Sequence, residues 1–364
     1  MKKIAILFLV IFSFLSTSML AQRGGALYTL GYPRFAKAIR LGNAYTGIAE
    51  GSEALFYNPA GIANQDYYSV IFSKDMGAAL FIDDFGSMDY SVVAPLPKNY
   101  GSVGIMINTL WMKFGSDKNS ETVYSIHYAR KIKNNFFLGI SGGLYSTKFE
   151  NLQIYEPDGT FTIKTISASA FGLSLSALYS MPEKLKLMKN DDFKIGFQFK
   201  NIVSSKLKYE EFDQEDVLFQ NVRAGVSYKL VPDLKKIYGF YPIKFLAAFD
   251  AVFKAADYNF ETWQPNYGLE VTLLEILKLS FGRENEIKIE DVYSSSVQFP
   301  VNRFGFGLII PVNKFLRLKP KLDIKFNYAI SDWQKLNETE KGGAFWFGNE
   351  IDDDVISAEL KILF

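Results

Sequence analysis

The sequence predicts an all-β protein, a fourteen-stranded antiparallel β-barrel that spans a membrane. Apolar and polar residues alternate along many segments, and short connections alternate with long ones. Hydrophobic residues make up 48% of the chain, yet beyond the N-terminal leader no apolar run approaches the length of about eighteen residues that a membrane helix needs. A bilayer cannot satisfy free backbone groups, so a chain without such helices spans it only as a closed barrel.

The C-terminal residues give the clearest strand pattern. In Ile356–Phe364 the residues Ile356, Ala358, Leu360, Ile362 and Phe364 fall on one face of an extended strand, and Ser357, Glu359 and Lys361 fall on the other. One face suits lipid and the other a polar interior. The terminal Phe364 is similar to the assembly signal on the last strand of bacterial outer-membrane barrels. Taken alone, the pattern also fits an amphipathic edge strand of a soluble sheet.

The same alternation recurs along the chain. Fourteen segments match it, most of them close to the nine to eleven residues of a tilted membrane strand. They are Tyr67–Lys74, Met88–Pro95, Gly101–Met112, Thr122–Lys131, Phe136–Phe149, Ile166–Tyr179, Asp192–Lys200, Asn221–Leu230, Lys244–Lys254, Tyr267–Leu273, Leu277–Glu284, Arg303–Ile310, Lys321–Ser331 and the terminal strand.

The short and the long connections between the predicted strands also differ in charge. The short connections include Leu96–Tyr100, Leu274–Ile276 and the somewhat longer Val231–Pro242, and this side of the barrel carries many lysines, among them Lys133, Lys235 and Lys236. The long connections include Asn151–Thr165, and the last of them, Asp332–Asp354, is strongly acidic. Short periplasmic turns opposite long outer loops are typical of bacterial outer-membrane barrels. We therefore expect the protein in the bacterial outer membrane, with residues 67–364 forming the barrel.

The N-terminus predicts export. Lys2 and Lys3 precede the apolar stretch Ile4–Leu15, followed by small and polar residues, which is the layout of a secretory signal peptide over residues 1–21. Cleavage after Ala21 leaves the mature chain starting near Gln22, and a cut after Ser18 fits the small-residue rule better. The sequence has no Cys, which excludes a lipoprotein anchor.

Residues 22–66 form a separate segment that is too rich in Gly and Ala to form strands. Its stretches Arg40–Ala49 and Ser52–Ala63 resemble the opening of the FadL-like outer-membrane proteins, most closely their PorV/PorQ branch. Members share R-x-G-x-A-Y/F-T-A followed by A-x-x-Y/W-N-P-A-G-L-A, from which Gly47 and Ile62 depart. The resemblance implies a fourteen-stranded barrel with an N-terminal plug in its lumen. The alternative is a helix and turn that simply lead into the first strand.

Within this segment we expect a plug turn. Asn58-Pro59 favours a turn, and Gly61 has no Cβ to restrict its backbone. The residues of the turn, which we expect to shape the plug rather than contact a ligand, are Asn58, Pro59, Ala60 and Gly61.

Charged residues alternate with apolar ones in the predicted strands. On the lipid face a Lys or Arg would cost about 2–4 kcal/mol at the midplane, so these residues are expected to face the lumen. There they either pair with one another and with the plug or line a hydrated path. They are Lys194, Lys200, Arg223, Lys244, Asp250, Arg303, Asp323, Lys325, Glu359 and Lys361.

Catalytic and cofactor chemistry has no support in the sequence. The single histidine, His127, together with the absence of Cys, disfavours zinc sites and Cys–His catalysis, and His127 is expected to be a hydrogen-bonded structural residue. No phosphate-binding glycine loop is present. Asp352–Asp354 fits a solvated loop better than a calcium site. We therefore expect that the protein is not an enzyme and binds no metal and no cofactor. The net charge of +1 gives no reason to expect binding to nucleic acid.

Two functions from different classes remain open. The first is passive transport of hydrophobic or amphipathic small molecules, based on the resemblance and on aromatic residues in the predicted outer loops. The second is a non-enzymatic subunit of an outer-membrane secretion or assembly complex, similar to type IX secretion, that binds partner proteins through its outer loops. A purely structural barrel is a weaker third reading. The expected partners in every case are the lipid bilayer and the barrel-assembly machinery, and the sequence names no substrate.

Overall fold

The computed structural model describes residues 34–75, 84–155, 160–182, 188, 190–209, 214–218, 220–255, 261–287, 298–312, 321–333 and 354–363. The predicted signal peptide, residues 22–33 of the predicted plug segment, most of the acidic loop Asp332–Asp354, and Phe364 lie outside these residues. None of the helices in the described part of the chain is long and apolar enough to cross a membrane.

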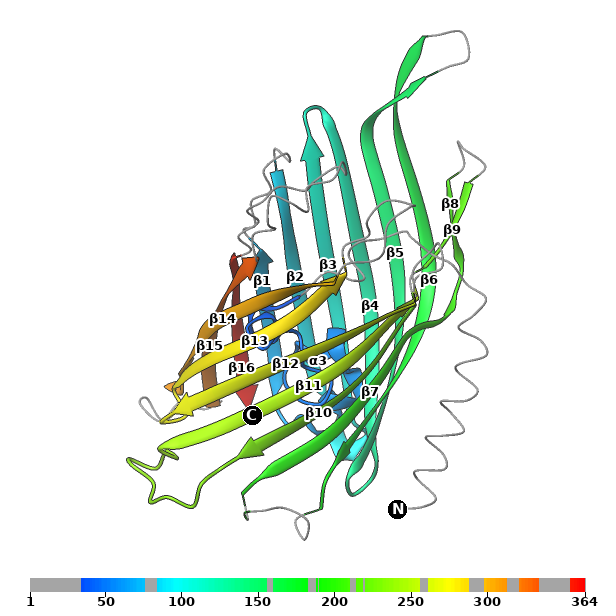
Figure 1. Cartoon of the computed structure of the whole chain (residues 1–364). Helices are drawn as coiled ribbons and strands as arrows, with labels where there is room; N and C mark the ends of the chain where they lie inside the picture. Colours follow the sequence, from blue (N-terminus) through cyan, green and yellow to red (C-terminus); the bar gives the residue numbers. More distant parts are fainter. Residues whose placement is uncertain are drawn as a thin grey trace.

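Fourteen strands of the described chain close into one antiparallel barrel, as predicted (Figure 1). Each pairs with its neighbours in the chain, β1 pairs with β16, and β7 pairs with β10. The strands are β1 (Tyr68–Asp75), β2 (Asp84–Pro95), β3 (Ser102–Phe114), β4 (Asp117–Lys133), β5 (Phe136–Tyr155), β6 (Phe161–Ser180), β7 (Asp192–Ser204), β10 (Gln220–Leu230), β11 (Ile243–Ala255), β12 (Glu261–Leu273), β13 (Leu277–Ile287), β14 (Gln298–Ile310), β15 (Lys321–Trp333) and β16 (Asp354–Leu363).

The strand faces follow the alternation of the sequence. On β15, Phe326 is 43% exposed and points away from the barrel, whereas the next residue, Asn327, is only 4% exposed and points inward. Asn327 lies opposite Ser357 of β16, which is also buried. The exposed apolar face therefore meets lipid, and the polar face lines the lumen.

Several strands run further than the sequence predicted. β5 and β6 have 20 residues each, about twice what a tilted crossing needs, and Figure 1 shows them extending well beyond the neighbouring strands. Part of the predicted outer loop Asn151–Thr165 is therefore strand. The predicted loop Asn201–Phe219 contains a further small hairpin, β8 (Lys206–Tyr209) and β9 (Gln214–Val217), which the sequence analysis missed because each strand has only four residues.

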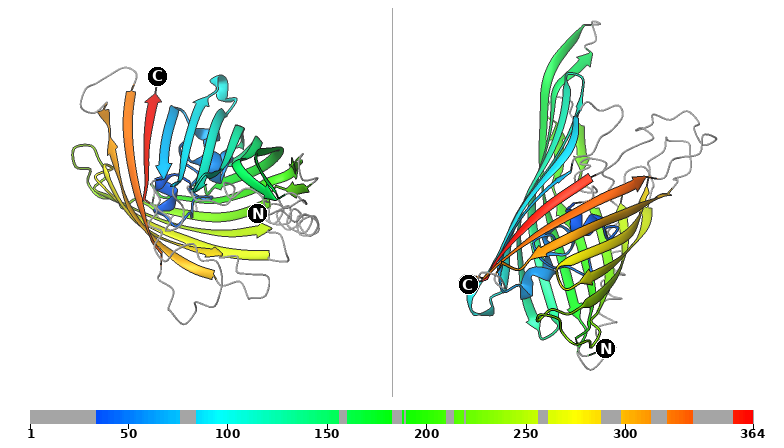
Figure 2. Two further views of the ribbon diagram at one scale, coloured as in Figure 1. Left: turned by 90° about the horizontal axis from the view of Figure 1, so that it is seen from above. Right: turned by 90° about the vertical axis from the view of Figure 1, so that its left-hand side faces the viewer.

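The N-terminal segment, residues 34–66, lies inside the ring of strands (Figure 2). It contains α2 (Ala36–Ile39), α3 (Ala54–Tyr57) and the 3₁₀-helix η3 (Pro59–Asn64), and another 3₁₀-helix, η4 (Pro97–Asn99), lies in the β2–β3 turn. Almost every residue from Arg34 to Ala63 is buried. Tight bends at Gly42 and Gly51, both with positive φ, let the segment fold back on itself in the lumen.

Candidate functional site

The N-terminal segment is held to the barrel wall at one bend by a buried carboxylate. Asp250 of β11 is fully buried, and its Oδ2 accepts hydrogen bonds from the backbone N–H of Tyr45 (3.1 Å), the backbone N–H of Thr46 (3.0 Å) and the Thr46 hydroxyl (2.6 Å). Beside it, Arg223 of β10 donates to the Asn43 carbonyl at 3.3 Å and lies over the Tyr57 ring. Both wall residues belong to the predicted lumen-facing set.

A second anchor surrounds Arg40, a residue that the sequence analysis did not assign a role. Its guanidinium pairs with Glu270 of β12 at 2.8 Å and also donates to Ser280 and Asn327. Both side chains are buried, Arg40 completely and Glu270 to within 2%. A buried charge is stable only when it is paired, so this pair fixes the bend after α2 against the wall. The sequence feature that pointed to Arg40 was its place as the first residue of the motif shared with FadL-like proteins.

The predicted lumen residue Arg303 lies in the same region. It is buried on β14, pairs with Glu284 of β13 at 3.0 Å and donates to Ser331. Glu284 in turn accepts a hydrogen bond from Asn43 of the segment. The chain of polar contacts thus runs from the segment through one acidic side chain to a wall arginine.

The predicted turn Asn58–Gly61 lies against β5 and β6. The Asn58 side chain accepts from the Ala60 N–H at 3.2 Å and donates to the carbonyls of Thr46 and Ala177, at 2.9 and 3.0 Å. Pro59 occupies the first turn of η3, where its missing N–H costs nothing. A Cβ on Gly61 would overlap the Ala49 carbonyl, so the turn requires glycine at this position.

Glycines of the wall create room for the segment. A Cβ at Gly196 of β7 would overlap the Thr46 carbonyl, and one at Gly282 of β13 would overlap Gly42. Gly268 faces Leu41 in the same way. The backbone of the segment therefore touches the backbone of the barrel at positions where no side chain fits. The lumen-side glycines of the predicted strands were a signal for this contact that the sequence analysis did not use.

Several other predicted lumen charges lie on β7, β15 and β16. Lys194 of β7 pairs with Glu50 of the segment at 3.2 Å, and Lys325 of β15 pairs with Glu359 of β16 at 3.0 Å. Lys361 donates to the Tyr67 hydroxyl at 2.6 Å, and Asp323 lies opposite Lys361 in the β15–β16 register. Most of these charges have partners within the wall or on the segment.

Glu53 of the segment is an exception to this pairing. It is 1% exposed, and neither carboxylate oxygen has a hydrogen-bond partner among the described residues. Burial raises the pKa of Glu53, and the nearby Glu359 carboxylate raises it further, against the opposing effect of Lys37 and Lys325. The environment therefore favours the neutral, protonated form of this side chain.

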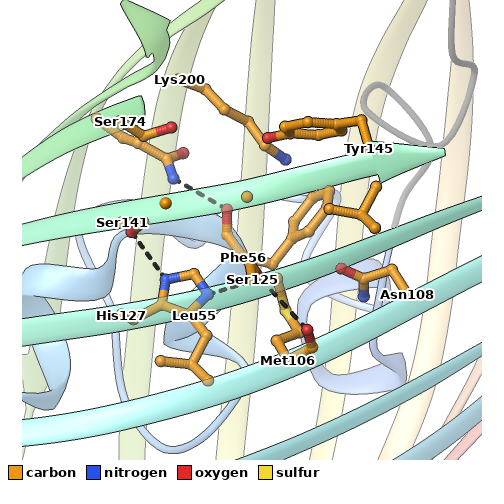
Figure 3. Close-up of a pocket in the computed structure, with 14 residues that line it drawn as sticks. Leu55, Phe56, Met106, Asn108, Ser125, His127, Ser141, Tyr145, Ser174 and Lys200 are labelled. Atoms are coloured by element: carbon orange, nitrogen blue, oxygen red, sulfur yellow. Dashed lines mark hydrogen bonds between the residues drawn. The ribbon is translucent and has the colours of Figure 1, made fainter. Parts of the chain in front are cut away.

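A hollow lies between the segment and strands β3 to β7 (Figure 3). Its free cavity volume is about 20 Å³, which is room for about one water molecule, and it is partly open to solvent. Leu55 and Phe56 of α3 form its floor, and Met106 adds to the apolar side. The hydroxyl and amide groups that line it come from Asn108, Ser125, Ser141, Tyr145, Ser174 and Gln198.

His127 and Lys200 are the titratable nitrogen groups of the hollow. The two ring nitrogens of His127 are hydrogen bonded to the hydroxyls of Ser125 and Ser141, at 2.9 and 2.8 Å (Figure 3). The Lys200 ammonium lies 3.9 Å from the centre of the Phe56 ring, a cation–π contact. No group of three or more residues able to hold a metal ion occurs among the described residues. The lining is thus mixed, with one apolar side and one hydrogen-bonding side.

The small hairpin covers the wall beside this hollow. Leu207 of β8 and Leu218 after β9 are buried with Tyr145, Ala168 and Ala170 in one apolar cluster. Tyr145 belongs both to this cluster and to the lining of the hollow. The hairpin β8–β9 therefore packs on the inner surface of the extended β5–β6 wall.

Comparisons with known proteins agree with the barrel. No protein-family model and no curated protein matches the sequence. Among solved structures, a Pseudomonas aeruginosa FadL homologue matches with a TM-score of 0.52 at 12% identity, over 90% of this chain and 98% of that one. The toluene transporter TodX of Pseudomonas putida matches with a TM-score of 0.51 at 11% identity, over 94% and 99%. A deltaS2 mutant of the monoaromatic hydrocarbon channel TodX gives 0.54 at 11%, over 93% and 100%.

At these identities the likeness concerns the fold. The chain has the fold of FadL-type outer-membrane β-barrels over almost the full length of these structures. The narrower assignment to the PorV/PorQ branch stays a prediction, because none of the three structures is described as a member of that branch.

Proposed function

We propose that the protein is a passive outer-membrane channel for small hydrophobic or amphipathic molecules, with residues 34–66 acting as the plug of its lumen. The observation that carries this proposal is the mixed hollow at Phe56 and His127, which lies directly beside the buried segment inside a closed barrel. A solute that crosses such a barrel has to pass between the segment and the wall. The hollow marks the place where the described segment and wall leave a gap, and the segment has to move to widen it for a solute.

The described functions of similar structures support the same class of solute. TodX is described as a toluene transporter and as a monoaromatic hydrocarbon channel. The apolar floor of the hollow fits an apolar solute, and its hydroxyl and amide groups fit a solute with one polar end. The secretion-subunit alternative has no support from these comparisons. Stoichiometric co-purification of a partner protein from detergent-solubilised membranes would revive it.

Uptake of N-phenylnaphthylamine tests the proposal. This hydrophobic dye fluoresces on entering membranes and is kept out by a lipopolysaccharide-covered outer membrane, so uptake by intact cells that express the chain measures passage. We expect faster uptake with the native chain than with cells that lack it. Equal uptake by both would overturn the channel function.

A matched pair of variants locates the path. Met106 lines the hollow, whereas its neighbour Ile105 is exposed on the lipid face of the same strand. Met106→Trp should reduce uptake several-fold by filling the hollow, and Ile105→Trp should leave it unchanged. Heat-modifiable mobility on gels confirms that both variants form barrels. Unchanged uptake with a folded Met106→Trp barrel would place the path elsewhere.

A further inference from the structure

The turn between β10 and β11, residues 231–242, differs from the other described turns at the same end of the barrel. It is longer than the turns at Pro97–Asn99 and Leu274–Ile276, and Figure 1 shows it projecting from the end of the barrel. Its tip is a small hairpin in which Ile237 and Phe240 exchange backbone hydrogen bonds of 3.0 and 2.9 Å. Tyr238 and Gly239 between them both have positive φ, as a tight two-residue hairpin turn requires.

This tip exposes large apolar side chains. Tyr238 is 95% exposed, Leu234 is 49% exposed and Ile237 is 47% exposed. Lys235 and Lys236 lie between them in the sequence and are exposed too, and the single acidic residue of the turn is Asp233. Apolar groups gathered on a surface usually mark a contact with a membrane or a partner.

The base of the turn is fixed, so the tip has a defined position. The Leu274 N–H donates to the Pro242 carbonyl at 2.9 Å, and the Tyr241 N–H donates to Glu275 at 3.3 Å. Glu275 also pairs with Lys244 at the start of β11. These contacts tie the base of the turn to the neighbouring β12–β13 turn, and nearer the tip the Lys236 ammonium lies 4.4 Å from the centre of the Tyr241 ring.

The lipid-facing surface of the barrel continues into this turn. Phe245 on β11 is exposed, as are Leu273 and Leu274 at the adjacent β12–β13 turn. Short turns of such barrels lie on the periplasmic side, next to the head groups of the inner leaflet. Aromatic residues flanked by lysines are typical of that interface, where the ring lies at the level of the head groups and the ammonium groups meet anionic lipids.

We propose that residues 231–242 form an interfacial anchor, in which Leu234, Ile237 and Tyr238 enter the head-group region of the periplasmic leaflet and Lys235 and Lys236 bind anionic phospholipid head groups. The continuity with the lipid-facing surface favours lipid over a protein partner. The anchor would hold this side of the barrel at a fixed depth in the membrane. This role is independent of which solute the lumen carries.

Environment-sensitive labelling tests the anchor on the full barrel. The sequence has no Cys, so Tyr238→Cys and Ile237→Cys each give one site for an NBD fluorophore, and Lys98→Cys in the β2–β3 turn gives the control. The barrels are placed in lipid nanodiscs, where both faces are open to solvent, made of phosphatidylcholine with or without phosphatidylglycerol. Heat-modifiable mobility establishes that each variant is folded.

We expect the labels at 237 and 238 to emit at shorter wavelength than the label at 98, to be quenched by doxyl-labelled lipid, and to be several-fold less accessible to iodide. Phosphatidylglycerol should strengthen these effects, and the double variant K235E/K236E should remove that gain, whereas K98E should not. Labels at 237 and 238 as accessible to iodide as the label at 98 would overturn the anchor. Lipid quenching that does not respond to phosphatidylglycerol or to K235E/K236E would overturn the role of the two lysines.

Discussion

Thr46 donates both its backbone N–H and its hydroxyl to the same carboxylate oxygen of Asp250, at 3.0 and 2.6 Å. The two residues are 204 positions apart in the chain, one in the N-terminal segment and one in the middle of the barrel wall. The contact joins a bend that has no regular secondary structure to a strand that has a fixed register. It is the point at which the position of the segment is most directly set by the barrel.

Asp250→Ala should therefore loosen the segment. The substitution leaves the donors of Tyr45 and Thr46 buried without an acceptor, at a cost of about 1–3 kcal/mol for each group. We expect a lower temperature for the heat-modifiable transition and faster leakage of small polar solutes through the barrel. Ser227→Ala is the control, because Ser227 makes a single neutral hydrogen bond to Gly47 and its loss should cost about 1 kcal/mol. Equal transitions for the two variants would contradict the special position of Asp250.

Gly196→Ala tests the close approach of backbone to backbone. The added Cβ would overlap the Thr46 carbonyl, so the segment has to shift and the variant should lose thermal stability. Gly142→Ala is the matched control on β5, since its Cβ would meet only ordinary contacts with Phe171 and Leu173, at 3.5 and 3.7 Å. A Gly196→Ala barrel as heat-resistant and as tight as Gly142→Ala would mean that the segment is not seated against this strand.

The strands could be predicted because each one carries its own signal. The side chains of Lys321–Ser331 alternate between two solvents, lipid and a polar lumen, and that alternation is visible in one sequence. The outer ends of β5 and β6 could not be predicted in the same way. In β5 the register shifts between Phe149 and Leu152, and Asn151 has positive φ, so the alternation of Asn151–Ile154 does not continue the phase of the preceding residues.

The lumen contacts could be predicted only in part. A charged residue in a strand has to face inward, which singled out Asp250 and Arg223. Their partners, however, lie 204 and 180 positions away in a segment without periodicity. Arg40 and Glu270 were missed for that reason. Alternation alone would allow Arg at the lumen-facing position of Asn327. Asn327 accepts a hydrogen bond from Arg40, however, so a second arginine at this position would repel it.

Phe326→Arg tests the assignment of the faces. Phe326 is exposed to lipid on β15, and an arginine near the midplane of the bilayer should cost about 2–4 kcal/mol. We expect less assembled barrel in the outer membrane, measured by the heat-modifiable fraction in membrane preparations. Phe326→Leu keeps an apolar side chain and should assemble normally. If the arginine variant assembles as well as the leucine variant, Phe326 does not face lipid.

Glu53 and Glu50 of the segment should respond to pH in opposite directions. The raised pKa of Glu53 means that the folded barrel holds this proton more tightly than the unfolded chain does. The barrel therefore loses stability as the pH rises from the ordinary glutamate value of 4.5 to the raised value, and the loss persists above it. Glu53→Gln removes this loss, so its advantage over the native chain should be absent at pH 4 and present at pH 8.

Glu50 provides the comparison with the opposite sign. Burial alone would raise the pKa of Glu50, but Lys229, Lys194 and Lys37 outweigh it and hold the pKa well below its usual range. A lowered pKa contributes stability that is present above pH 4.5 and is lost as the pH falls through the folded value. Glu50→Gln should therefore lower the heat-modifiable transition temperature at pH 8, where Glu53→Gln raises it. Because the two residues lie three positions apart in one buried segment, a general disturbance of the plug would shift both variants in the same direction. Opposite shifts at pH 8, with the Glu53→Gln effect disappearing toward pH 4 and the Glu50→Gln effect disappearing only at lower pH, would instead establish that the lumen disfavours the ionised form of Glu53 and favours that of Glu50.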